Sequence, residues 1–105
     1  MRALKRKELS SIEKVGWKVG QIDDVTFDQL VKALGKPTFK PKHFSDDKVQ
    51  YEWVVPYEDK IFRIYDWKTF SKTYTKYGLT TWSVGGSNSC NWFLQSLMNK
   101  IEQNG

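Results

Sequence analysis

The chain has 105 residues, enough for a single domain with one modest core and too few for two. Hydrophobic residues make up 39% and charged residues 28%, which excludes a disordered chain, and no apolar run approaches the roughly 20 residues of a membrane span. The net charge of +5 favours anionic partners such as nucleic acid, nucleotides or an acidic protein surface. The basic N-terminus lacks the apolar stretch of a secretory signal and the single cysteine fits a reducing compartment, so we expect a cytoplasmic protein.

Residues 1–20 form a basic segment, which we expect to be an arm, mobile or helical, ahead of a single α+β domain over residues 21–105. Apolar residues at loosely helical spacing indicate a short helix over residues 1–15: Leu4, Leu9, Ile12 and Val15. The excess positive charge falls in two clusters, Arg2, Lys5, Arg6 and Lys7, and then Lys36, Lys40 and Lys42. Clusters of this size are more often solvated surface than binding site.

The segment after this arm carries the clearest helix signal. Thr26 can act as N-cap, and Gln29 follows three residues later, the arrangement of a capping box. Gly35 can take the left-handed position that ends a helix, and Pro37 prevents its continuation. The sequence therefore predicts a helix over residues 27–34.

Three segments with the pattern of β-strands follow. Residues 49–55 alternate with the period of a half-buried strand, which Pro56 should end. A hairpin connection then leads to a second strand over 61–67, and a third strand is expected over 79–84. Apolar residues from Phe93 onward recur at helical spacing until near Gln103. This order predicts an α+β fold in two layers, a small antiparallel sheet of about three strands with two helices packed on one face.

Four short motifs in this order resemble small, uncharacterised accessory proteins of phages and other large DNA viruses. The motifs are LGKPT at 34–38, KVQYEW at 48–53, IYDWK at 64–68 and WSVGG at 82–86. The resemblance covers residues 25 to about 102, and it implies a viral accessory protein without supplying an activity. The group often has histidine where this chain has Ser83, so the resemblance also lowers the expectation of an enzyme.

The glycine turn Gly85-Gly86-Ser87 lies between the third strand and the last helix. Backbone N–H groups at such a turn, close to the positive end of a helix, bind anions readily. The alternative is that the glycines supply unusual dihedrals while Ser87 or Ser89 caps the helix. The turn lacks the lysine and the spacing of a Walker A loop.

Catalysis has one candidate nucleophile, Cys90, in the first turn of the last helix. That position lowers the pKa of a thiol, and a pair with His43 is conceivable. A single cysteine is otherwise a small buried apolar residue. One cysteine and one histidine are too few ligands for a zinc site, and we expect neither a metal nor a cofactor.

An aromatic strip on the strands is the remaining signal. It comprises Tyr51, Trp53, Tyr65, Trp67 and Trp82, interleaved with Lys48, Arg63 and Lys68. On an exposed face these residues would make a stacking platform for bases, and the alternative is that they form the core beneath the helices. For Glu52 with Arg63, and for Asp66 with Lys68, we prefer structural ion pairs to acid–base chemistry.

These observations favour a non-enzymatic viral accessory protein that occupies a host protein, such as one of a defence system, or its anionic nucleotide or nucleic-acid ligand. The expected contact residues are Trp53, Arg63, Tyr65, Trp67, Lys68, Trp82, Gly85, Gly86 and Ser87. One alternative is a basic, aromatic-rich protein whose function is nucleic-acid binding itself, and another is a small enzyme that uses Cys90. A homo-oligomer is possible.

Overall fold

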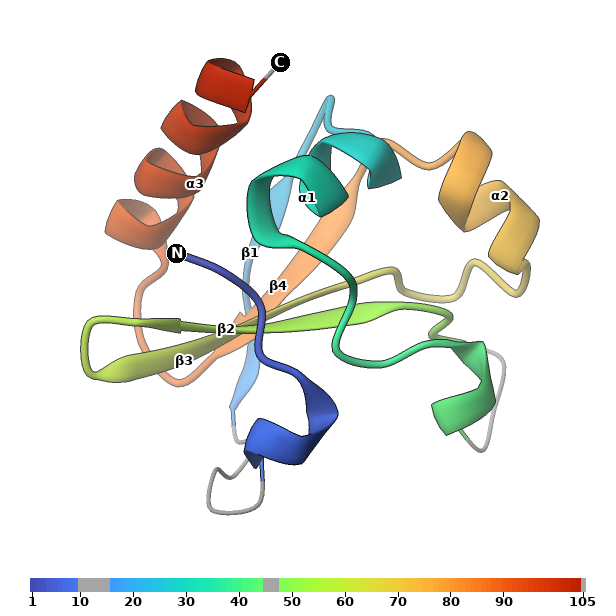
Figure 1. Cartoon of the computed structure of the whole chain (residues 1–105), viewed down its shortest axis with the longest axis horizontal. Helices are drawn as coiled ribbons and strands as arrows, with labels where there is room; N and C mark the ends of the chain where they lie inside the picture. The colour runs from blue at the N-terminus through green and yellow to red at the C-terminus, as the bar shows by residue number, and fades with distance from the viewer. Residues whose placement is uncertain (10–15, 45–47, 105) are drawn as a thin grey trace.

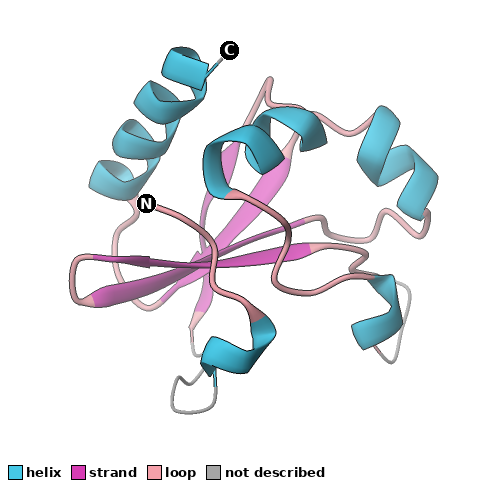
Figure 2. Cartoon of the chain, viewed as in Figure 1, coloured by secondary structure: helices cyan, strands magenta, loops and turns pink. Residues whose placement is uncertain are grey.

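The structure is a computed structural model that describes residues 1–9, 16–44 and 48–104. In these residues a four-stranded antiparallel sheet of order β1-β4-β3-β2 packs against helices (Figures 1 and 2). The elements in chain order are η1 (Arg6–Leu9), β1 (Trp17–Ile22), α1 (Phe27–Leu34), η2 (Pro41–His43), β2 (Glu52–Tyr57), β3 (Lys60–Tyr65), α2 (Lys72–Tyr77), β4 (Trp82–Gly86) and α3 (Asn91–Asn104), where η marks a 3-10 helix. The predicted α+β class is confirmed, with β1 and α2 in addition to the expected strands and helices. None of the described helices is long and apolar enough to cross a membrane.

Helix α1 has the bounds that the sequence predicts, and its capping box is present. The Thr26 hydroxyl accepts a hydrogen bond from the backbone N–H of Gln29 at 3.1 Å, and the Gln29 side chain accepts one from the Thr26 N–H at 2.8 Å. At the other end Gly35 has a φ of 91°, and its N–H donates to Val31 O. Local sequence therefore sets both ends of this helix.

Two buried tryptophans fasten α1 to the sheet. Trp82 on β4 donates its indole N–H to Val25 O at 2.7 Å, just before the helix. Trp53 on β2 donates to Gly35 O at 3.0 Å, just after it. The two indoles meet edge to face, with centroids 5.4 Å apart, and Phe27 of α1 contacts both. A buried indole needs a partner for its N–H, so these bonds fix the helix at both ends.

Helix α3 completes the layer on the same face of the sheet (Figure 1). Phe93 stacks on Phe62 of β3, with centroids 4.5 Å apart and planes 7° from parallel. Leu97 and Ile101 continue the buried stripe of the helix. We call the face under α1 and α3 the covered face, and the opposite side the open face.

Strand β2 differs from the prediction at its end, because Pro56 lies inside it. Pro56 pairs with Ile61, and the hairpin turn is only Glu58-Asp59. Proline is tolerated in an edge strand when the missing N–H would point away from the neighbouring strand. The prediction that Pro56 ends the strand is therefore wrong.

The outer edge of β2 is occupied by two other parts of the chain. Leu4 donates its N–H to Val54 O at 2.8 Å, and Phe39 exchanges two backbone hydrogen bonds with Glu52. The Thr38 hydroxyl accepts from the Val54 N–H at 3.0 Å. These bonds satisfy an edge that would otherwise be open to pairing with another chain.

Strand β1 crosses the predicted boundary at residue 20 and pairs with β4. Residues 17–20 thus belong to the sheet rather than to a separate arm. Of the helix expected over residues 1–15, the described part shows only the short turn η1, and residues 10–15, with Ile12 and Val15, lie outside the described residues.

Candidate functional site

The predicted aromatic strip is divided between the two faces of the sheet. Trp53 and Trp82 are 0% exposed, so the prediction that they contact a ligand is wrong and the core alternative holds for both. The alternation of side chains along a strand explains this division. Residues two positions apart lie on the same face, and Trp53 and Trp82 lie on the face that α1 and α3 cover. Tyr51 is also buried, whereas Trp67 is 53% exposed and Tyr65 lies half-buried on the open face.

Arg63 forms the ion pair that the sequence predicts, and the pair changes what Arg63 can offer a ligand. Its Nη1 lies 3.1 Å from Glu52 Oε1, and the two side chains are 19% and 4% exposed. The guanidinium lies over Gly85, where an added Cβ would come within 2.6 Å of Nη2. Glu52 already neutralises the charge of Arg63, so we assign Arg63 a structural role rather than the role of an anion receptor.

The glycine turn is not a turn at these positions. Gly85 and Gly86 are the last residues of β4. Gly85 pairs with Lys18 of β1 and Arg63 of β3, and Gly86 pairs with Trp17 of β1. Gly86 packs against the Phe62 ring on the covered face, whereas Ser87 is exposed beyond the strand. Helix α3 begins later, at Asn91, and its first i→i−4 hydrogen bond runs from Leu94 N–H to Cys90 O. Gly85 and Gly86 therefore do not form the turn on which the predicted anion cradle depends, and ligand contact at Ser87 stays a prediction.

Cys90 is buried, with a relative exposure of 3%. Burial raises the pKa of its thiol, which donates a weak hydrogen bond to Val19 O at 3.5 Å. An activated thiol requires the opposite shift, so the surroundings of Cys90 do not activate it as a nucleophile. Across residues 1–9, 16–44 and 48–104 no group of three or more His, Cys, Asp and Glu side chains could hold a metal ion.

Asp66 is fully buried and makes no ion pair with Lys68. Its carboxylate accepts hydrogen bonds from the backbone N–H groups of Gln50 and Tyr51, both at 2.9 Å. The hydroxyls of Thr69 and Thr75 also donate to it. These bonds tie the start of β2 to the segment between β3 and α2, so Asp66 has a structural role.

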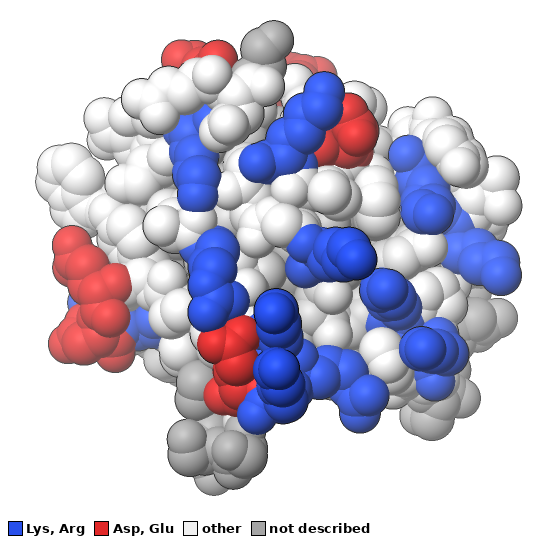
Figure 3. Space-filling model, viewed as in Figure 1, with Lys and Arg blue, Asp and Glu red and all other residues white. Residues whose placement is uncertain are grey.

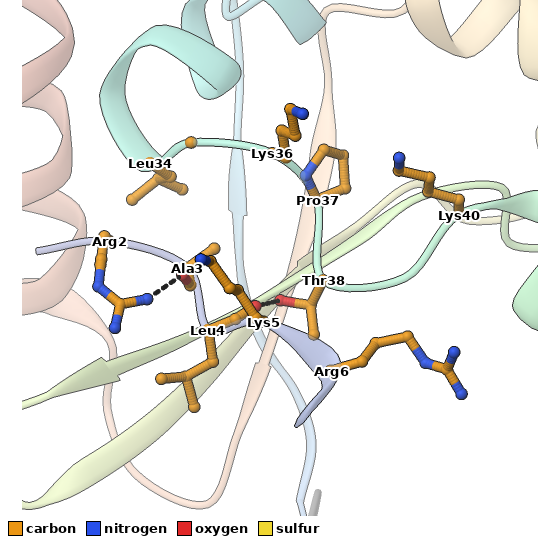
Figure 4. A pocket seen from close by; sticks show the side chains of 11 residues that line it. Arg2, Ala3, Leu4, Lys5, Arg6, Leu34, Lys36, Pro37, Thr38 and Lys40 are labelled. Atoms are coloured by element: carbon orange, nitrogen blue, oxygen red, sulfur yellow. Dashed lines mark hydrogen bonds between the residues drawn. The ribbon is translucent and has the colours of Figure 1, made fainter. Parts of the chain in front are cut away.

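The fold brings the two basic clusters of the sequence together around one hollow (Figures 3 and 4). The hollow has a volume of about 360 Å³ and lies between the N-terminal segment and the loop after α1. We call it the basic groove; its lining residues are Arg2, Ala3, Leu4, Lys5, Arg6, Leu34, Gly35, Lys36, Pro37, Thr38 and Lys40.

Hydrogen bonds hold the two sides of the basic groove against each other. Ala3 donates its N–H to Leu34 O at 2.9 Å. The Thr38 hydroxyl donates to Leu4 O at 2.7 Å, as the dashed line in Figure 4 shows. Ala3 is buried, with 6% exposure. The described N-terminal residues are thus part of the packed structure, and the groove is fixed before any ligand arrives.

The charge of the basic groove is mostly uncompensated. Arg2 makes two hydrogen bonds to Glu8, and these bonds, with that of the Lys5 N–H, lower the pKa of Glu8 to about 2. The other four cations of the groove have no carboxylate within 4.0 Å among the described residues.

His43 provides a second sign of this positive potential. Its Nδ1 accepts a hydrogen bond from Lys40 N–H at 2.9 Å, as a neutral ring does. Burial lowers the pKa of His43, and the charges of Arg6, Lys42 and Lys40 lower it further. The two basic clusters therefore act on one imidazole.

Sequence reasoning noted both basic clusters but did not join them. The available signal was their position on either side of a helix whose bounds were predictable, with a Gly-Lys-Pro-Thr turn that carries Lys36 into the second cluster. The missing information was that the N-terminal segment runs beside that turn.

Comparison with known proteins supplies no relative from which a function could be transferred. The resemblance to viral accessory proteins therefore stays a prediction, and function has to be argued from the geometry and charge of the sites. No protein-family model, no curated protein and no solved structure matches this chain.

Proposed function

We propose that the protein binds the phosphate backbone of nucleic acid in the basic groove. One observation carries the proposal: cations from two segments far apart in the sequence converge on one hollow without carboxylate partners among the described residues. Lysine and arginine side chains that neutralise phosphates release counterions, and this release drives sequence-independent binding. The net charge of +5 adds long-range attraction.

The lining of the groove favours contact with the backbone over reading of bases. Its apolar part is made by Ala3, Leu4, Leu34 and Pro37, which present no side-chain hydrogen-bond donors to base edges. Apart from the Thr38 hydroxyl, which donates to Leu4 O, the polar side chains of the lining are cations, the type of side chain that contacts phosphate oxygens. We therefore expect binding with little sequence preference.

Nucleic-acid binding is one of the alternatives that the sequence analysis left open. The other hypothesis placed the contact on an aromatic face, and two of its three tryptophans are in the core. A viral accessory role, a host partner, a cytoplasmic location and the lack of enzymatic activity stay predictions.

The test is fluorescence anisotropy with labelled single-stranded and duplex oligonucleotides between about 50 and 200 mM salt, a range over which phosphate contacts weaken strongly. The double variant Lys5→Ala/Lys36→Ala should bind about tenfold or more weakly, and its salt slope should fall by about 2 because two phosphate contacts are lost. Lys60→Ala/Lys72→Ala has the same net charge and removes two cations outside the groove, so it should bind almost as the natural sequence does.

His43 gives an independent readout by NMR titration. A bound phosphate offsets the charges of Arg6, Lys40 and Lys42, so oligonucleotide should raise the pKa of His43 toward its ordinary value of 6.5. Equal losses in the two double variants would show that net charge alone drives binding. Equal competition by polyglutamate would assign the groove to acidic protein surfaces, and either result would overturn the proposal.

A further inference from the structure

A trough runs along β4 on the open face of the sheet. Trp82 and Val84 point into the core, so alternation directs Ser83 and Gly85 to the open face. The register places Tyr65 beside Ser83, and it places Arg63 and Lys18 on either side of Gly85. Small residues on the central strand between large residues on both neighbours produce a depression.

The Arg63 guanidinium fills one end of the trough, because it lies over Gly85. The other end is open and forms a hollow of about 270 Å³ lined by Lys18, Tyr65, Trp67 and Ser83. We call this hollow the sheet-face pocket. It shares no lining residue with the basic groove.

The sheet-face pocket combines aromatic rings with positive charge. The rings of Tyr65 and Trp67 stand nearly perpendicular, at 87° with centroids 6.4 Å apart. Lys68 Nζ lies 5.8 Å from the centre of the Trp67 ring, and Lys18 supplies a second ammonium group. Lys18 donates a hydrogen bond to the neutral Gln21 Oε1 at 3.3 Å, and it has no ion pair with a carboxylate of residues 1–9, 16–44 and 48–104.

The protein holds Trp67 in place although its side chain is exposed. The preceding residue, Asp66, is anchored by its buried hydrogen bonds, and the N–H of Lys68 donates to Lys48 O at 2.6 Å. Lys68 and Phe70 both have positive φ, 56° and 57°, a conformation that costs energy for residues other than glycine. The loop thus presents a preorganised aromatic ring to the solvent.

We propose that the sheet-face pocket binds a nucleoside phosphate, with its base stacked on Trp67 and its phosphate held by Lys18 and Lys68. A planar base uses the aromatic ring, and the phosphate uses the two ammonium groups. A simple anion would leave the ring without a role, and an apolar ligand would leave the charges without one. The ligand is either a free nucleotide or one unit of a single strand, and the inference does not depend on the basic groove.

The first experiment compares three probes by NMR on the full ¹⁵N-labelled chain: adenosine monophosphate, adenosine and ribose 5-phosphate. The monophosphate should bind about tenfold more tightly than either fragment, because each fragment lacks one of the two contacts. Its addition should shift the Trp67 indole signal and the amide signals of Lys18 and Ser83. Equal binding of ribose 5-phosphate, or shifts confined to the basic groove, would overturn the inference.

The second experiment uses two exposed tryptophans as a matched pair. Trp67→Ala should weaken binding of the monophosphate about tenfold, the size expected for loss of one stacked base. Trp92→Ala removes a tryptophan of α3 that is even more exposed, at 76%, and should leave the affinity unchanged. Because Trp67 lies outside the core, its variant should fold, and unchanged binding by folded Trp67→Ala would refute the site.

A third comparison identifies the source of the nucleotide. A short oligothymidylate that binds at least about tenfold more tightly than thymidine monophosphate indicates a strand, and equal affinities indicate a free nucleotide; either result supports the pocket. Both titrations are repeated in Lys5→Ala/Lys36→Ala. Failure of the groove proposal would leave nucleotide binding intact, whereas failure of the pocket would leave the salt-dependent binding in the groove.

Discussion

The two faces of the sheet carry the same kinds of side chain in opposite roles. On the covered face, Trp53 and Trp82 are fully buried, and each donates its indole N–H to a backbone carbonyl at one end of α1. On the open side, Trp67 is 53% exposed and faces a pocket. Residue type therefore does not distinguish an aromatic core from an aromatic surface; the element above the sheet does.

The polar residues show the same contrast. Asp66 accepts several hydrogen bonds in a fully buried position, and Glu52 pairs with Arg63 just outside the core. Lys18 of the sheet-face pocket and Lys68, which lies beside Trp67, have no carboxylate partner among the described residues. Charges that hold the structure are hydrogen-bonded or ion-paired in buried positions, whereas exposed cations without a carboxylate partner mark the surfaces where we place ligands.

The largest expected effect separates the two classes of tryptophan. Trp82→Ala removes a buried indole that contacts Trp53 and Phe27, so it should lower the free energy of unfolding by about 3–5 kcal/mol. Trp67→Ala should change it by less than about 0.5 kcal/mol, as exposed substitutions do. Urea unfolding followed by circular dichroism measures both.

Trp82→Phe sharpens this comparison because it keeps an aromatic ring and removes the indole N–H. Val25 O then loses its donor, and we expect a loss intermediate between those two values. A Trp67→Ala variant as unstable as Trp82→Ala would show that the open face is part of the core. That result would also remove the basis for the sheet-face pocket.

The next effect concerns the buried carboxylate that supports the open face. Asp66→Asn replaces an acceptor oxygen with a donor among groups that already donate, so it should cost about 3 kcal/mol. Asp59→Asn, in the exposed hairpin turn, makes the same chemical change and should cost almost nothing. Equal stability of the two variants in urea would contradict the structural role of Asp66.

Local signals in the sequence predicted local structure well. The bounds of α1 follow from Thr26, Gln29 and Gly35, whose interactions lie within the segment itself. The ion pair of Glu52 and Arg63 followed from strands that are neighbours in sequence and in space. These features depend on contacts between residues less than about a dozen positions apart.

Features that depend on distant pairing were not predictable in this way. Strand β1 pairs with β4, at separations of 60 to 69 positions from Ile22↔Trp82 to Trp17↔Gly86. Its short sequence gave no sign of that partner. A tryptophan is buried or exposed according to which face of the sheet the helices cover. The alternation of residues along a strand does not tell which face that is. The basic groove likewise exists only because Leu4 docks beside Thr38, a contact across 34 positions.

The smallest expected effect concerns Gly85, which leaves space for the Arg63 guanidinium in the trough on the open face. An alanine Cβ at Gly85 would lie 2.6 Å from Arg63 Nη2, so the guanidinium must shift away from its place over β4. We expect Gly85→Ala to cost about 1 kcal/mol, the lower end of overpacking effects, because the end of a long side chain moves more easily than backbone. In an Arg63→Ala background the same substitution should cost much less, since the clash is gone. Equal costs in the two backgrounds, measured as a double-mutant cycle in urea, would show that backbone conformation rather than Arg63 requires the glycine.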